Sequence, residues 1–278
     1  MQQVIATHWR GRWQCRIDAV PPLAWLAAQA AALWPHWRWA AARLLDGSDD
    51  PLGLAALAAL LWAALRLAPA LRAEPHPRWG TASLGLTLAA TLASLLAPPL
   101  LGALLAALAM ACGLRAFMPA GQPGLPLAGL ALLSLPVLSS LQFYAGYPLR
   151  VLTAQASTWI LQALGMQAER SGSAMLVDGQ LVIVDAPCSG VQMAWLAYFA
   201  ACAVAAFTGL ADRRFMARLP WVGLIVLTGN VVRNSALVAL DAGHHAVSEL
   251  VHQGIGLAVL ALVCAAVVGV MRGGRDAH

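Results

Sequence analysis

The sequence predicts an all-α polytopic membrane protein with about eight transmembrane helices. Of its 278 residues, 60% are hydrophobic and 10% are charged, and the mean hydropathy is +0.72. These values are far more apolar than those of a soluble globular domain. The apolar residues also gather in successive runs, most of them near the ~20 residues with which an α-helix crosses a bilayer. Both observations favour a bundle of membrane-spanning helices.

The composition also excludes several kinds of chemistry. All 17 basic residues are arginine, so serine–lysine dyads and lysine Schiff bases are excluded. The arginines are scattered between the apolar runs and form no basic arm, so no nucleic-acid partner is expected despite the net charge of +5. The five cysteines are an odd number and lie mostly within apolar runs, which predicts no disulfide framework.

Proline, glycine and charged residues separate the apolar runs and set the bounds of the predicted spans. We expect spans at about 19–42, 51–70, 79–97, 100–117, 127–144, 188–210, 219–240 and 250–271. Pro35 breaks the first run, and Pro98-Pro99 makes a tight turn between the third and fourth spans. The loop between the first two spans is acidic, with Asp46, Asp49 and Asp50.

The segment between the fifth and sixth spans differs in character. Over 148–164, apolar residues recur at helical spacing with polar residues between them, which predicts an extracytoplasmic amphipathic helix on the membrane surface with Pro148 in its first turn. Asp178-Gly179, flanked by 173–177 and 180–184, then predicts a short β-hairpin with a type I′ turn.

The chain is therefore expected to have three parts. These are an N-terminal transmembrane region at 1–145, the amphipathic helix and hairpin at 146–187, and a three-span region at 188–278 that carries the reactive side chains. The short loop between the sixth and seventh predicted spans contains Arg213, Arg214 and Arg218, and further arginines follow the eighth span. Because arginine-rich short loops stay in the cytoplasm, the hairpin is expected on the extracytoplasmic side.

This topology brings three reactive groups to one level near the outer surface. Cys188 and His252 lie at the outer ends of their spans, and Arg233 lies about seven residues, or roughly 10 Å, below the outer end of the span between them. An ionisable residue at that depth indicates a functional site. Gly254 and Gly256 are expected to let a neighbouring helix approach closely.

A cysteine, a histidine and an arginine are the side chains that thiol acyl transfer requires. The histidine would take the thiol proton and later protonate the leaving amine, and the arginine would stabilise the oxyanion. No carboxylate lies deep within a predicted span, which argues against an aspartyl intramembrane protease. Cys188, His244, His245 and His252 could instead bind zinc, but the adjacent histidines lack the usual ligand spacing. We therefore expect no metal and no other cofactor.

Three short motifs occur in a fixed order in the last half of the chain. They are Ala186-Pro187-Cys188-Ser189-Gly190, Asn230-Val231-Val232-Arg233, and His252 with Gly256 four residues later. This set resembles the exosortase/archaeosortase family. The resemblance implies a membrane cysteine transpeptidase, a thiol protease of the bacterial inner membrane with its active site on the extracytoplasmic side.

The resemblance also implies the substrate class and the residue roles. The substrates would be exported proteins that end in a short motif, a transmembrane helix and an arginine-rich tail, and membrane lipids would surround the enzyme. The catalytic cysteine, arginine and histidine of the family correspond to Cys188, Arg233 and His252, with Ser189 and Asn230 in support. Gln253 stands where many relatives carry an acidic residue. The partner that orients His252 is then Asp185, Asp241 or Glu249.

Two other functions are open to the sequence. A non-enzymatic transporter or assembly factor for exported polymer could use Arg233 to bind an anionic group, but it should not need Cys188. Thiol–disulfide exchange is disfavoured because the chain lacks a CxxC pair. His244 or His245 could assist or replace His252. We expect the surface helix and hairpin to form a lid or a docking edge for an extended substrate rather than a plain connector.

Overall fold

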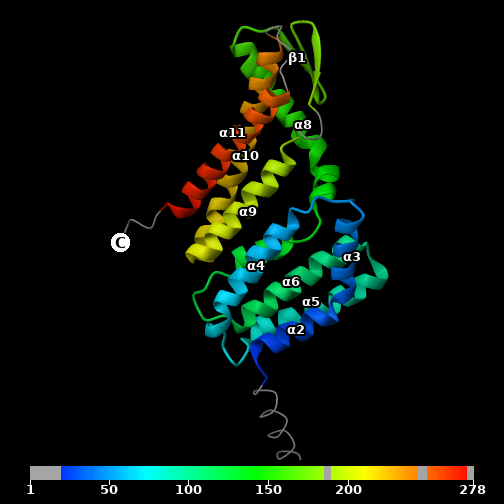
Figure 1. Ribbon diagram of the computed structural model, residues 1–278, viewed down its shortest axis with the longest axis vertical. Helices are drawn as coiled ribbons and strands as arrows, with labels where there is room; N and C mark the ends of the chain where they lie inside the picture. The colour runs from blue at the N-terminus through cyan, green and yellow to red at the C-terminus, as the bar shows by residue number, and fades with distance from the viewer. Residues whose placement is uncertain (1–19, 185–188, 243–248, 274–278) are drawn as a thin grey trace, which may run out of the picture. The chain divides into compact units, whose positions relative to one another are not determined.

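The computed structural model of the protein describes residues 20–184, 189–242 and 249–273 (Figure 1). The chain divides into two compact units, the N-terminal unit (Met1–Pro136) and the C-terminal unit (Val137–His278). The three-part division at residues 145 and 187 stays a prediction.

The regular elements in the described part of the N-terminal unit are all helices. Its elements are α2 (Pro22–Ala32), α3 (Trp34–Leu45), α4 (Gly53–Leu67), the short 3₁₀ helix η1 (Ala68–Ala70), α5 (Pro77–Leu96), α6 (Pro99–Phe117) and α7 (Leu125–Leu133). Helices α5 and α6 pack along each other (Figure 1). Pro77 and Pro99 begin these helices, where a missing N–H breaks no bond, so the predicted turn at Pro98-Pro99 is confirmed.

The predicted first span is divided into two helices. Helix α2 ends at Ala32 and α3 begins at Trp34, which confirms the predicted break next to Pro35. Each piece has 11 or 12 residues and a length of about 17 Å. Neither piece alone is long enough to cross a bilayer.

Hydrogen bonds of polar side chains join the helices of this unit. The Nε2 atom of Gln29 on α2 donates to the Ser83 hydroxyl on α5 at 2.8 Å and to the Ala109 carbonyl on α6 at 3.0 Å. On α3, the Nε2 atom of buried His36 lies 3.1 Å from the Ala90 carbonyl oxygen. Such bonds satisfy polar groups that lipid cannot.

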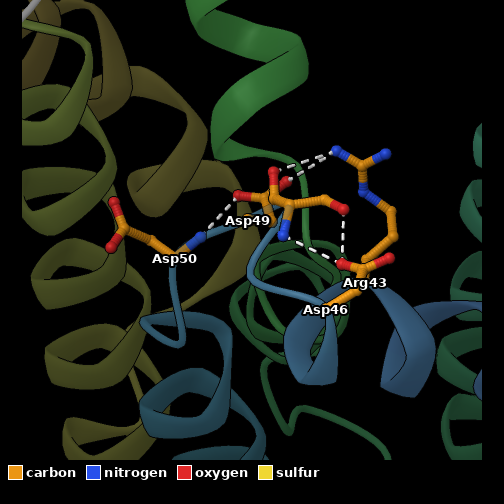
Figure 2. Close-up of polar contacts among 5 residues, drawn as sticks. Arg43, Asp46, Asp49 and Asp50 are labelled. Carbon is orange, nitrogen blue, oxygen red and sulfur yellow. Dashed lines mark hydrogen bonds and ion pairs between the residues drawn. The ribbon is translucent and has the colours of Figure 1, made fainter.

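The acidic loop after α3 is held by its own polar contacts, as Figure 2 shows. The Arg43 guanidinium pairs with the Asp49 carboxylate at 3.7 Å. The Asp46 carboxylate accepts bonds from the backbone N–H of Ser48, at 2.9 Å, and from the Ser48 hydroxyl. These bonds favour the ionised form and lower the pKa of the Asp46 carboxyl below its ordinary value.

The C-terminal unit combines long helices with a small sheet. Its elements are α8 (Leu138–Ala163), β1 (Ala168–Ser171), β2 (Ala174–Val177), β3 (Gln180–Ile183), α9 (Val191–Thr208), α10 (Asp212–Ala242) and α11 (Glu249–Arg272). Helices α9, α10 and α11 lie side by side (Figure 1). The strands are antiparallel in the order β1-β2-β3. One face of the sheet packs on α8 and α10 through Leu161, Met175, Val177 and Val238.

The predicted hairpin is confirmed, and the structure adds a strand to it. Asp178 and Gly179 have φ values of 48° and 82°, and a type I′ turn requires positive φ at both positions. Strand β1 was not expected, because Ala168–Ser171 is a polar tetrapeptide, AERS. It forms by pairing with β2.

The predicted start of the amphipathic helix is wrong. Helix α8 begins at Leu138, and Pro148 lies inside it. The chain breaks instead between α7 and α8 at Pro136, because proline disfavours helical geometry in the residue before it. The apolar side of α8 is exposed at Leu152 and Trp159, whereas its polar residues Thr153 and Ser157 are buried.

The polytopic all-α fold class is confirmed. In the described part of the chain, six helices are long and apolar enough to cross a membrane: Gly53–Ala70, Pro77–Leu96, Pro99–Phe117, Val191–Thr208, Asp212–Asp241 and Leu250–Arg272. Helices α7 and α8 would add a seventh if the two are counted as one broken span. The expected eight is therefore an approximate number, and the split first run accounts for the difference.

Candidate active site

A pocket of about 410 Å³ opens among α9, α10 and α11. Its lining includes Gly190, Asn230, Arg233, His252 and Gly256. Two of the three residues that the motifs predict as catalytic, Arg233 and His252, thus line one cavity. Cys188, the third, lies outside the described residues, but Gly190 at the wall of the pocket follows it by two positions.

Arg233 is well inside its helix and lies against a glycine of the next one. It is nine residues before the end of α10 at Ala242, or about 14 Å along the axis. A Cβ atom at Gly256 would lie 3.3 Å from Arg233 Nε and 3.5 Å from Nη2. The guanidinium therefore crosses α11 at Gly256, one helical turn or about 6 Å beyond His252.

The two glycines that follow His252 have different surroundings. The close approach predicted for Gly256 is confirmed, and the group that approaches is the Arg233 side chain. At Gly254, no atom of the described residues lies within 4 Å of a Cβ built there, and the close approach predicted at this position stays a prediction. Two residues correspond to about 200° around a helix, so the two positions face opposite sides of α11.

Ser189 and Gly190 fix the start of α9 immediately after Cys188. The Ser189 hydroxyl donates to Gln142 Oε1 on α8 at 2.9 Å and accepts a bond from the Val191 N–H at 3.3 Å. Gly190 has φ +82°, and a Cβ there would lie 2.9 Å from the Asn230 side chain. Only glycine meets both conditions. The predicted supporting residues Ser189 and Asn230 thus contact the elements that hold this turn.

A buried polar seam joins α8 to α10 next to the pocket. Asn230 Nδ2 donates to the Thr153 hydroxyl at 2.9 Å, and Asn234 Nδ2 donates to the Ser157 hydroxyl at 3.0 Å. Sequence reasoning missed Thr153, Ser157 and the Ser189 partner Gln142. A signal for the seam is present in the sequence, since both helices carry their polar pair at a spacing of four residues, which places each pair on one helix face.

The candidates for orienting His252 are only partly described. Asp241 is exposed on α10, eight residues beyond Arg233 or about 12 Å along the axis. Glu249 begins α11. Asp185, His244 and His245 lie outside the described residues, so the partner of His252 stays a prediction. Within 20–184, 189–242 and 249–273, no group of three or more His, Cys, Asp or Glu residues could hold a metal ion.

Fold and site together define a polytopic membrane protein in which an arginine and a histidine line one pocket among candidate membrane-spanning helices. The chain matches the family model of the transmembrane exosortases (Exosortase_EpsH) over residues 30–269, and it belongs to that family. The match begins in α2 and ends in α11, so it extends well beyond the motif-bearing half of the chain. A search of curated proteins and a search of solved structures each found no match.

Proposed function

We propose that the protein is a cysteine peptidase or transpeptidase that cleaves the C-terminal sorting signal of exported proteins through a thioester at Cys188. The observation that carries this proposal is the shared pocket of Arg233 and His252, walled by Gly190 two residues after Cys188. Membership of the transmembrane exosortase family supports it.

In the first half of the reaction, His252 accepts the Cys188 thiol proton, and the thiolate attacks the scissile carbonyl carbon. The carbonyl oxygen becomes an oxyanion beside the Arg233 guanidinium, a cation in a water-poor setting, where such stabilisation has its largest effect. The C–N bond then breaks, and His252 returns its proton to the leaving amine. A thioester between Cys188 and the substrate results.

In the second half, an amine, a hydroxyl or water attacks the thioester carbon. His252 takes the proton of that nucleophile, Arg233 again stabilises the oxyanion, and the Cys188 sulfur leaves and is reprotonated. Transfer and hydrolysis differ only in the acceptor. The site would lie at the extracytoplasmic side of a bacterial inner membrane, and its substrates would carry a short motif, a transmembrane helix and an arginine-rich tail.

The test is mass spectrometry of the C-termini of envelope and secreted proteins in the native host, comparing wild type with Cys188→Ala at matched expression. We expect anchored precursors with intact arginine-tailed ends to accumulate only in the variant. Identical C-termini, with the variant stable and inserted, would exclude the thiol enzyme. A transporter that uses Arg233 to bind an anionic group would then be the function to test.

A further inference from the structure

The two edges of the three-stranded sheet differ in how they are protected. At the β1 edge, the Ala168 carbonyl accepts a bond from Gln162 Nε2 on α8 at 2.8 Å. The Arg170 side chain on the same strand donates to Gln155 on α8 at 2.7 Å. Strand β3, at the other edge, pairs with β2 alone among the described strands. One edge is thus covered by a helix, and the other is open as far as residues 20–184, 189–242 and 249–273 are concerned.

The register shows which backbone groups of β3 face outward. The Val184 N–H donates to the Ser173 carbonyl at 3.0 Å, so these residues form a hydrogen-bonded pair. Because such pairs alternate with non-hydrogen-bonded ones in an antiparallel ladder, Leu181 and Ile183 lie in non-hydrogen-bonded pairs with β2. Their N–H and C=O groups point away from the sheet, and within the described residues nothing bonds them.

The exposed face of the sheet next to this edge is apolar. The side chains of Leu176, Leu181 and Ile183 are 45%, 67% and 56% exposed. Natural sheets usually protect such an edge with proline, a charge or a bulge, and β3, with the sequence QLVI, has none of these. An open apolar edge of this kind is suited to pairing with another strand.

We propose that β3 binds an extended segment of the substrate as a fourth strand. This inference rests on the proposed function, because the occupant is the peptide to be cleaved. Chain continuity argues for that occupant, since β3 ends five residues before Cys188 and Gly190 reaches the pocket of Arg233 and His252. A paired strand would therefore be delivered beside the cysteine.

The register also specifies the chemistry of the peptide. In an antiparallel fourth strand, the peptide residues opposite Leu181 and Ile183 would each exchange two backbone hydrogen bonds with β3, four in all. Directly opposed side chains share one face of a sheet. The peptide side chains at these two positions therefore lie on the apolar face with Leu176 and Leu181, and the substrate segment carries apolar or β-branched residues at alternate positions.

The test uses proline to remove single outward N–H groups. Leu181→Pro and Ile183→Pro delete donors that β2 does not use, at an edge where proline is tolerated. The matched control, Leu181→Thr, keeps the donor and the strand propensity but loses apolar surface. In the full-length protein at matched abundance, pulse-chase of substrate processing should be about two- to tenfold slower for each proline variant than for the wild type, and Leu181→Thr, which keeps the outward N–H, should be slowed less than Leu181→Pro.

Photo-crosslinking gives a second measurement that does not depend on folding of the proline variants. A photoreactive phenylalanine is placed at position 181 in one variant and at position 183 in another, both in the Cys188→Ala background. The two variants should crosslink to substrate residues that are two positions apart. Crosslinks to a second copy of this chain would overturn the proposal, as would a Leu181→Thr variant as slow as Leu181→Pro, which would indicate lipid contact.

Different experimental results would contradict the proposed function and the proposed docking of substrate on β3. Cys188-dependent processing that proceeds at the wild-type rate in both proline variants overturns strand docking and leaves the enzyme intact. Unchanged C-termini in Cys188→Ala overturn both.

Discussion

The protein contains two pockets of similar size whose walls differ in kind. In the N-terminal unit, a pocket of about 480 Å³ is lined by Gln29, Ser83 and Thr87 among apolar residues, and no ionisable group is among its described lining. In the C-terminal unit, a pocket of about 410 Å³ is lined by Arg233 and His252.

The difference separates two uses of polar side chains within a membrane. Gln29 donates its amide hydrogens to Ser83, Thr87 and Ala109, so its polarity is used to join helices. A guanidinium in a span is far more costly to keep there than an amide. Arg233 and His252 line one pocket, as the proposed thiol chemistry requires, and under that proposal substitutions in the two pockets should have different consequences.

The largest expected effect is that of Arg233→Gln. Loss of the cation from the oxyanion position should slow cleavage by about 10²–10³-fold, with little change in protein abundance. The measurement is the rate at which processed C-termini form in a pulse-chase experiment. Arg213→Gln, at an exposed position on the same helix, is the matched control, and equal slowing by both substitutions would contradict the distinction between the pockets.

Gly256→Val should come next in size. The new side chain begins 3.3 Å from Arg233 Nε, so the guanidinium must move, and a shift of about 1 Å in an active site can slow a reaction about 100-fold. We expect cleavage to slow by roughly ten- to a hundredfold. Gly254→Val, two residues away at a position where no described atom lies within 4 Å of a Cβ, should retain activity. A Gly254→Val variant that is equally slow would indicate a general effect on α11.

Gly229→Ala should act on stability rather than on chemistry. A Cβ at Gly229 would lie 2.4 Å from Val263 Cγ2, so α10 and α11 must separate or repack, at about 1–3 kcal/mol. Thermal unfolding of the purified protein in detergent measures this change. Gly269→Ala meets no atom of the described residues within 4 Å and is the control, so a similar loss there would refute the packing explanation.

Gln29→Leu tests the N-terminal pocket directly. Removal of its interhelical hydrogen bonds should destabilise the protein by about 1 kcal/mol, measured by the same unfolding experiment, and cleavage by the folded protein should be unchanged. A large loss of activity without a loss of stability would assign the N-terminal pocket a functional role and contradict the difference between the N-terminal and C-terminal pockets.

The smallest effect is expected at Asp46. Its folded pKa is lowered by the bonds from Ser48, so the stability that it contributes is present above the ordinary carboxyl pKa and is lost as the pH falls through the folded value. The difference in melting temperature between wild type and Asp46→Ala should be small at neutral pH, because the group is exposed. It should vanish in acid, and a difference that grows there would have the wrong sign.

The long apolar runs predict the membrane helices well, because length and hydropathy alone determine which segments can cross. Helices α5, α6, α9 and α11 end within a few residues of their predicted bounds. The errors arise where two signals compete. Pro148 is predicted to start a helix, but in the structure it lies inside α8, where it is exposed. The break falls at Pro136, within a run that hydropathy alone treats as continuous.

The site was predicted in part for a related reason. Arg233 is conspicuous as a charge within an apolar run, and Gly256 follows His252 by one turn, so their neighbourhood could be inferred from helical spacing. Gln142 and Thr153 were missed because their partners, Ser189 and Asn230, are 47 and 77 residues away. The spacing of four residues marks a polar face on each helix, but a single sequence does not indicate which distant residues pair.

The polar seam between α8 and α10 has a mechanical consequence. Both of its bonds join residues separated by 77 positions, Thr153 with Asn230 and Ser157 with Asn234, so the two helices run in the same direction with a fixed axial offset. If one helix slid by a turn, at most one of the two bonds would form, and the remaining two polar side chains would have no partner in an apolar medium. The two bonds thus hold α8 and α10 at one axial offset. Because Gln142 on α8 also accepts a bond from Ser189, α8 in turn positions the start of α9, which follows Cys188 in the sequence.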